Sequence, residues 1–216
     1  MSITDQQIID ETVKFVRATL QNAEGGHDWW HIHRVWLNAK KIAEHEPCDM
    51  LTVELAALLH DIADSKFHNG DEEIGPATAG KFLTELGVDP EIITHVQQII
   101  RHISFKSSFG EVKFQSPELN IVQDADRLDA LGAIGIARTF SFGGFKGREI
   151  YNPEIPPDLK MSKEEYKKST NPSINHFYEK LLLLKDKMNT SAGRQMAQQR
   201  HEFMEEYLKQ FYSEVE

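Results

Sequence analysis

Apolar side chains recur every three or four residues along almost the whole chain, which is the period of an amphipathic helix. The N-terminal stretch shows this period clearly, with Ile8, Ile9, Val13, Val16 and Leu20. The pattern predicts helices over residues 5–24, 28–46, 50–64, 72–86, 90–104, 117–140, 172–188 and 191–212. No repeat or convincing two-residue alternation predicts a sheet. We therefore expect an all-α fold.

Residues that begin or end helices separate these stretches. Pro47 cannot continue the second helix, and the Asn69-Gly70 pair favours a turn after the third. Asp89-Pro90 is typical of an N-cap followed by the first helical residue. These signals support the predicted order of helices.

The Gly- and Pro-rich stretch over 141–162 interrupts the helical pattern and predicts a long loop. We expect C-terminal helices over about 172–214 after it. A chain of 216 residues suits a single domain, so residues 1–216 are predicted to form one domain with this loop as an insertion.

Charge and composition limit the kinds of ligand and the cellular compartment that we expect for this protein. The formal net charge of −10 argues against broad nucleic-acid binding, which a basic surface supports, but it leaves room for small phosphorylated substrates. The single Cys48 cannot form an internal disulfide, which favours a reducing compartment. No signal peptide or bilayer-length apolar run is visible, so a cytoplasmic protein without membrane attachment is expected.

Histidine and aspartate gather in three separated segments of predicted helix. These are GHDWWHIHRVW at 26–36, LLHDIADSKFH at 58–68 and QDADRLDA at 123–130. Each segment places polar groups that can bind a metal beside apolar positions that would face a core. An ionised carboxylate in such a place is costly unless it is paired or bound to a cation.

The best candidates for metal ligands are His31, His60, Asp61 and Asp126. Adjacent helix positions differ by about 100° in direction, so His60 and Asp61 can share one ion only at the margin of the buried face. Two imidazoles and two carboxylates suit one divalent ion with positions left for water and substrate. Mn²⁺, Mg²⁺, Fe²⁺, Co²⁺, Ni²⁺ and Zn²⁺ all remain open.

The chain resembles the HD-domain metal-dependent phosphohydrolases, and within them a small bacterial subgroup. That family has a histidine on one helix, an adjacent His-Asp pair on another and an aspartate on a later helix. His31, His60-Asp61 and Asp126 follow this order, in the contexts HDWWHIHRV, HDIAD and QDADRLDA. The resemblance covers nearly the whole chain. It implies a helical bundle with the metal inside and hydrolysis of phosphoester or phosphoanhydride bonds, often in nucleotides. In this subgroup, cleavage of a nucleoside triphosphate to a monophosphate and pyrophosphate is plausible.

Other groups could assist such a reaction. Asp64 lies one turn after His60 and could orient water or accept its proton. His102 could act as an acid or as a further phosphate contact. His27 could support the site from one turn before His31. The residues that could contact phosphate oxygens are Lys66, Lys106, Arg127, Lys146 and Arg148.

Three alternatives remain at this point. The same pocket could sense a nucleotide without cutting it, although the retention of all four ligands favours an enzyme. A helical oxygenase would need further histidines for a second iron, and His27 and His102 could serve. The polar groups could also be hydrogen-bonded within a core that holds no metal. The oligomeric state is open, with a homodimer as one alternative.

Overall fold

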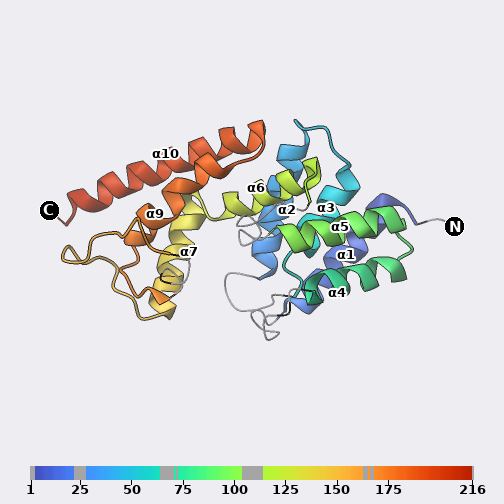
Figure 1. The fold of residues 1–216 in the computed structure, drawn as a ribbon, viewed down its shortest axis with the longest axis horizontal. Coiled ribbons are helices and arrows are strands. Elements are labelled where there is room, and N and C mark those ends of the chain that lie inside the picture. The colour runs from blue at the N-terminus through green and yellow to red at the C-terminus, as the bar shows by residue number, and fades with distance from the viewer. Residues whose placement is uncertain are drawn as a thin grey trace. The chain divides into compact units, whose positions relative to one another are not determined.

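The computed structural model describes residues 3–21, 28–63, 71, 73–103, 114–162, 165 and 168–215, and within these ranges it contains helices and turns but no strand (Figure 1). The all-α prediction is therefore confirmed. The helices are α1 (Asp5–Thr19), α2 (Trp29–Ala43), α3 (Met50–Leu59), α4 (Ile74–Glu85), α5 (Pro90–His102), α6 (Pro117–Asp129), α7 (Gly132–Phe145), α9 (Asn175–Glu179), the 3₁₀ helix η3 (Leu181–Lys187) and α10 (Ser191–Ser213).

The chain divides into two compact units, Met1–Asp126 and Arg127–Glu216. In the N-terminal unit, α3 lies at the centre and packs against α1, α2 and α5, while α4 packs against α5. Seven of the ten α3 residues are buried, which explains why its sequence is apolar on nearly every face. Because packing on nearly every side holds α3 in place, the position of the residues that follow its C-terminal end is also fixed.

Side-chain caps begin the helices of this unit. The hydroxyl of Thr4 accepts from the Gln7 amide while the Gln7 side chain accepts from the Thr4 amide, forming a capping box. Asp28, Asp49 and Asp89 accept backbone N–H groups in the first turns of α2, α3 and α5. The caps satisfy amides that a helix leaves without an internal partner.

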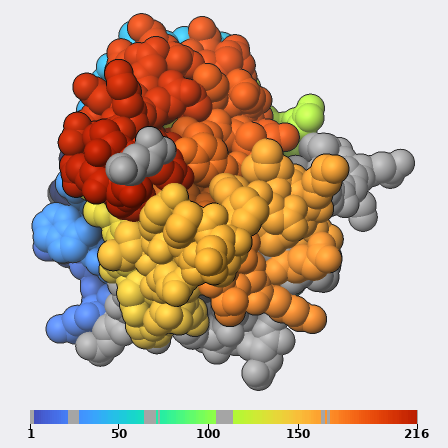
Figure 2. All heavy atoms as spheres, turned by 90° about the vertical axis from the view of Figure 1, so that its left-hand side faces the viewer, coloured from blue at the N-terminus to red at the C-terminus, as the bar shows by residue number. Residues whose placement is uncertain are grey.

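The C-terminal unit is built on α7, α9, η3 and α10. Its core includes Ile174, Phe177 and Met204, and the rings of Phe177 and Tyr207 stack with centroids 5.9 Å apart. Figure 2 shows α7 and the segment after it, in yellow to orange, beside the red C-terminal part of α10. Tyr151 in that segment packs edge-on against Phe211 of α10, at 5.8 Å between centroids.

The predicted helix over 117–140 is wrong in one respect, because the structure breaks it into α6 and α7. After α6 ends at Asp129, Leu131 is extended and Gly132, where α7 begins, adopts a φ of +69°, a left-handed conformation that other residues rarely adopt. A side chain at Gly132 would also approach Arg200 of α10, whose Cβ lies 3.2 Å from the ideal Cβ position. The apolar period of LGAIGIA continues through this break, so periodicity alone could not reveal it.

Two other boundaries differ from the sequence prediction. The loop expected over 141–162 begins later, because α7 runs to Phe145. The helix expected over 172–188 is interrupted at Lys180, whose φ of −145° and ψ of −56° separate α9 from η3. None of the helices among the described residues is long and apolar enough to cross a membrane.

Candidate metal centre

His31 lies in the first turn of α2, where its backbone is held by the helix cap. The Asp28 carboxylate accepts a hydrogen bond from the His31 amide at 2.9 Å. The His31 side chain is 2 % exposed, beside the fully buried Ile32 and Val35. The cap and the core therefore fix both the backbone and the ring of this histidine.

His60 follows directly after α3 and is the C-cap of that helix. The helix was expected to run to about residue 64, but it ends at Leu59, and Asp61–Ala63 lie in turns. The His60 Nδ1–H donates to the Ala57 carbonyl at 2.8 Å. This hydrogen bond fixes the neutral tautomer, so the lone pair of Nε2 is available for a cation. Nε2 is buried and has no hydrogen-bond partner among the described residues.

Asp61 and Asp126 bring the carboxylates to the same place. Asp61 follows His60 at the end of α3, and Asp126 lies in the last turns of α6. Asn38 of α2 donates to the carbonyl of Ala125 at 3.4 Å, which joins α2 to α6 next to Asp126. The Asp61 side chain is 23 % exposed and that of Asp126 is 42 % exposed. The carboxylate side of the group is therefore accessible to solvent.

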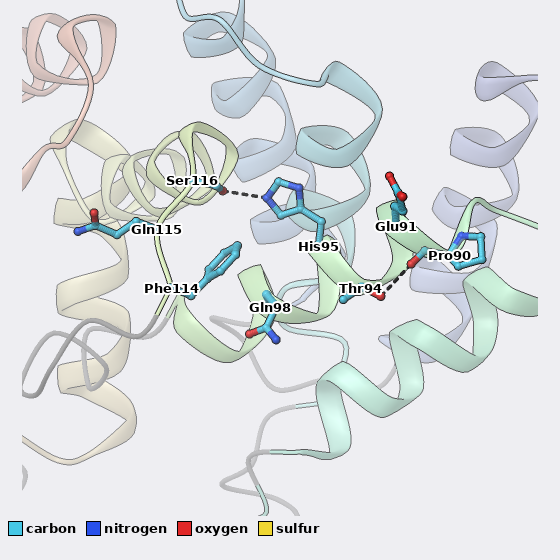
Figure 3. Close-up of a pocket in the computed structure, with 8 residues that line it drawn as sticks. All are labelled: Pro90, Glu91, Thr94, His95, Gln98, Phe114, Gln115 and Ser116. Carbon is cyan, nitrogen blue, oxygen red and sulfur yellow. Dashed lines mark hydrogen bonds between the residues drawn. The ribbon is translucent and has the colours of Figure 1, made fainter.

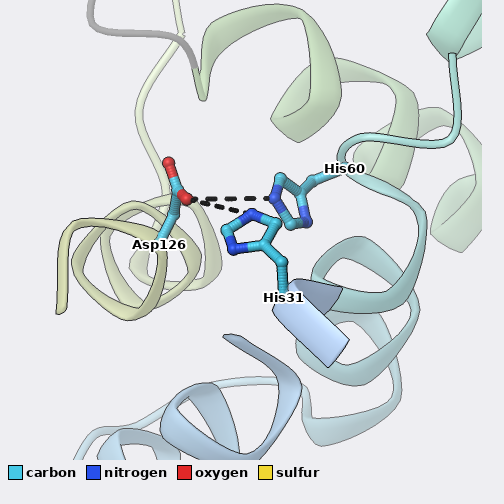
Figure 4. Close-up of side chains that lie close together, drawn as sticks. All are labelled: His31, His60 and Asp126. Atoms are coloured by element: carbon cyan, nitrogen blue, oxygen red, sulfur yellow. Dashed lines mark ion pairs between the residues drawn. The ribbon is translucent and has the colours of Figure 1, made fainter. Parts of the chain in front are cut away.

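The side chains of His31, His60 and Asp126 point toward one another (Figure 4). His31 Nε2 lies 3.6 Å from Asp126 Oδ1 and 3.7 Å from Asp61 Oδ2. His60 Nε2 lies 3.7 Å from Asp61 Oδ2 and 4.0 Å from Asp126 Oδ1. One ligand atom each from His31, His60 and Asp126 fits within 4.8 Å of the others.

These separations fit ligands around a single ion. Two atoms each about 2.1 Å from a metal lie roughly 3 to 4 Å apart at the usual coordination angles. They are also longer than normal hydrogen bonds, so hydrogen bonding between the histidines and carboxylates does not explain the grouping. His31, His60 and Asp126 could hold a divalent ion, and the Asp61 carboxylate lies close enough to both imidazoles to join them.

His102, the predicted acid, lies at the C-terminal end of α5. Its Nδ1–H donates to the carbonyl of Gln98 at 2.8 Å, which leaves Nε2 as the acceptor in the neutral ring. Gln123 of α6 donates to the His102 carbonyl at 2.9 Å. Since Gln123 lies one turn before Asp126, the end of α5 is joined to the helix that carries a candidate ligand.

Three predicted residues, Asp64, Lys66 and Lys106, lie outside the described residues, as does His27. The other three predicted phosphate contacts belong to the C-terminal unit.

Each of these three has other interactions within that unit. Arg127 donates to the Lys187 carbonyl at 2.6 Å, and Arg148 donates to the Ser169 carbonyl at 2.6 Å. The ammonium of Lys146 lies 5.1 Å from the centre of the Phe145 ring. Their roles in substrate binding stay predictions.

Sequence reasoning did not identify the groups that orient the histidines. Asp28 has a recognisable signal, because an aspartate three residues before a helical histidine is an N-cap pattern. The Ala57 carbonyl and the Gln123 carboxamide have no such sequence pattern. Every residue has a backbone carbonyl, and a glutamine side chain can form hydrogen bonds in many kinds of site.

Comparison with known proteins identifies relatives that match most of the chain. The family model for the HD domain matches residues 29–131. The uncharacterized protein YpgQ of Bacillus subtilis is 37 % identical over 202 residues, which is 93 % of this chain and 90 % of that protein.

Solved structures agree with this. An HD-superfamily hydrolase from Bacillus thuringiensis is 46 % identical, covers 98 % of both chains and superimposes with a TM-score of 0.79. YpgQ in complex with ADP is 36 % identical, with a TM-score of 0.75 over 98 % of this chain and 97 % of that one. The sequence match, the shared fold and the His/Asp group together show that the chain belongs to the HD-domain family.

Proposed function

We propose that the protein is a phosphohydrolase that binds one divalent metal ion through His31, His60, Asp61 and Asp126. The observation that carries the proposal is the convergence of His31 from α2, His60 from the end of α3 and Asp126 from α6, with Asp61 Oδ2 3.7 Å from both imidazoles. Two buried imidazoles form one side of the group, and two accessible carboxylates form the other. This leaves a solvent-facing side for substrate.

Hydrogen bonds within the protein hold the two histidines in position in the absence of substrate. The Ala57 carbonyl holds the His60 ring, and the Asp28 cap holds the backbone of His31. A divalent ion in such a centre supplies a water of lowered pKa and polarises a phosphoryl oxygen. Asp64 and His102 are the proposed groups for moving protons to and from the reacting atoms. Lys66, Lys106, Arg127, Lys146 and Arg148 are the proposed contacts to phosphate oxygens.

The proposed substrate is a small phosphorylated molecule, and specifically a nucleotide. YpgQ, a relative covering nearly the whole chain, has been solved with ADP, which supports a nucleotide. The proposed reaction converts a nucleoside triphosphate to a monophosphate and pyrophosphate. The competing function is a sensor that binds a nucleotide in the same pocket without hydrolysing it.

The test is hydrolysis of a panel of nucleotides and sugar phosphates with Mn²⁺, Mg²⁺ or a chelator, with phosphate and pyrophosphate measured separately. Wild type is compared with Asp61→Asn and with Asp186→Asn, an exposed carboxylate on η3 that serves as a matched control. We expect metal-dependent turnover that Asp61→Asn abolishes and Asp186→Asn retains. Nucleotide binding without turnover in every metal would refute the enzyme and support the sensor.

A further inference from the structure

A cleft of about 630 Å³ lies in the N-terminal unit, between α5 and the residues that precede α6 (Figure 3). Eight described residues line it: Pro90, Glu91, Thr94, His95, Gln98, Phe114, Gln115 and Ser116. The cleft is shallow and open to solvent, so a ligand in it would keep much of its surface exposed. None of these residues belongs to the candidate metal centre.

The Phe114 ring provides an aromatic surface in the cleft. Its centroid lies 5.6 Å from the His95 ring and 5.5 Å from the His102 ring, and Figure 3 shows it facing the side chains of α5. His95 and His102 are seven residues apart, so they lie on one side of α5 and support the ring from two places. An aromatic ring held in this way can stack against a flat heterocycle.

His95 forms a fixed wall of the cleft. Its Nε2 lies 2.9 Å from the hydroxyl of Ser116 and 3.4 Å from a carboxylate oxygen of Glu118. The other oxygen of the buried Glu118 accepts from the Asp49 amide at 2.9 Å. Since three helices contribute to this chain of contacts, the ring position is set by the fold and does not depend on a ligand.

Polar groups beside the ring are available to a ligand. The Gln98 side chain lines the cleft, and its carboxamide offers both donors and an acceptor. The Thr94 hydroxyl donates to the Pro90 carbonyl at 2.8 Å, which leaves its oxygen free to accept. Carboxamides match the paired donors and acceptors at the edge of a nucleobase.

The described lining residues include no cation that would bind phosphate. Of the eight described lining residues, Glu91 is the one with a fixed charge, and none is Lys or Arg. Among these eight residues a phosphate group would meet a carboxylate and no cation. They suit a neutral, planar group with hydrogen-bonding edges.

We infer that this cleft binds the base of a nucleoside or nucleotide, with Phe114 stacking on the base and Gln98 bonding to its edge. The inference rests on the proposed function for the class of ligand, but binding in the cleft requires neither metal nor turnover. The Phe114 side of the cleft adjoins His102, whose carbonyl Gln123 of α6 contacts. A nucleotide bound by its base could thus extend its phosphates toward the helix that carries Asp126.

The experiment measures binding of adenosine, cytidine and guanosine to the chelator-treated protein by titration calorimetry, with inorganic pyrophosphate as the phosphate-only probe. Variants are Phe114→Leu, which keeps an apolar side chain but removes the ring, and Gln98→Ala. Gln199→Ala, an exposed helical glutamine on α10, is the matched control. Circular dichroism and thermal melting establish that each variant is folded.

We expect at least one nucleoside to bind wild type without metal, while pyrophosphate does not. Loss of stacking should weaken this binding about tenfold in Phe114→Leu, and Gln98→Ala should also weaken it and change the preference among bases. Gln199→Ala should bind like wild type. No nucleoside binding to wild type, or unchanged binding in both folded cleft variants, would overturn the inference. Neither result depends on hydrolysis, so failure of the proposed function is detected separately by the turnover assay.

Discussion

Three glycines of α7 differ in the space around them, so an alanine at each should affect stability differently. An alanine Cβ at Gly135 would lie 2.2 Å from the Ala130 carbonyl oxygen and 2.5 Å from its carbon. At Gly143 it would lie 2.0 Å from the Ser173 hydroxyl oxygen and 3.1 Å from the Ser173 Cβ. At Gly144 no atom of the described residues outside its own stretch of helix lies within 4 Å.

The magnitudes follow from what can move. Each alanine favours the helix by up to about 1 kcal/mol over glycine. At Gly135 the obstructing atoms are backbone and cannot rotate away, so overpacking should cost about 3 kcal/mol and leave a net loss of about 2 kcal/mol. At Gly143 the hydroxyl can rotate and the Cβ need yield only slightly, so the net change should be near zero. At Gly144, close to the helix end, a gain of about 0.5 kcal/mol is expected.

Urea unfolding followed by circular dichroism measures these differences, and thermal melting provides a second measure. The loss in Gly135→Ala should lower Tm by roughly 4–8 °C in a chain of this size. The expected order of stability is Gly144→Ala, then Gly143→Ala, then Gly135→Ala. A Gly135→Ala protein as stable as wild type would refute the reasoning, as would Gly143→Ala proving the least stable of the three.

Three further predictions concern the metal, pH and a surface ion pair. Mn²⁺ at about a hundred times its Kd should raise Tm by roughly 5–10 °C, and Asp126→Asn should reduce this rise; an equal rise in the variant would exclude Asp126 as a ligand. Burial, with Lys180 and Arg148 nearby, lowers the pKa of His176 to about 3. Below about pH 6.5 the His176 imidazole therefore binds a proton in the unfolded chain but not in the folded chain. The free energy of unfolding of wild type should fall by about 2 kcal/mol between pH 7 and 5, and that of folded His176→Gln should not show this fall. Urea unfolding at each pH measures the difference. Glu73→Gln removes an exposed pair with Arg101, and urea unfolding should show a change below about 1 kcal/mol.

The helices of the N-terminal unit were largely predictable because their signals are local. Asp49 and Asp89 are N-caps within three residues of the amides they bind, and the apolar period marks the buried faces. The break at Gly132 was not predictable, since it depends on a left-handed glycine and on packing against Arg200, which is distant in sequence. Periodicity detects which face is buried but not where the helix axis changes direction.

For the candidate site, the sequence predicted which residue types belong together, and the structure supplies their distances. The expectation that His60 and Asp61 share a helix failed because α3 ends at Leu59. Because His60 and Asp61 lie beyond the end of α3, both side chains can approach His31 and Asp126. Two adjacent residues of a regular helix would point in directions about 100° apart. The hydrogen bond from His60 to the Ala57 carbonyl could not be predicted, because its acceptor is backbone.

The contact between Glu118 and the Asp49 amide joins the starts of α6 and α3, and near the other end of α6 the Oδ1 of Asp126 lies 4.0 Å from Nε2 of His60, which directly follows α3. The nitrogen and oxygen atoms of the candidate centre lie 3.6–4.0 Å apart. Such separations favour small ions with ligands at about 2.0–2.2 Å over Ca²⁺, which needs six to eight oxygen ligands at about 2.3–2.6 Å. Ionic radius, as much as ligand chemistry, would then decide which abundant cation the protein excludes.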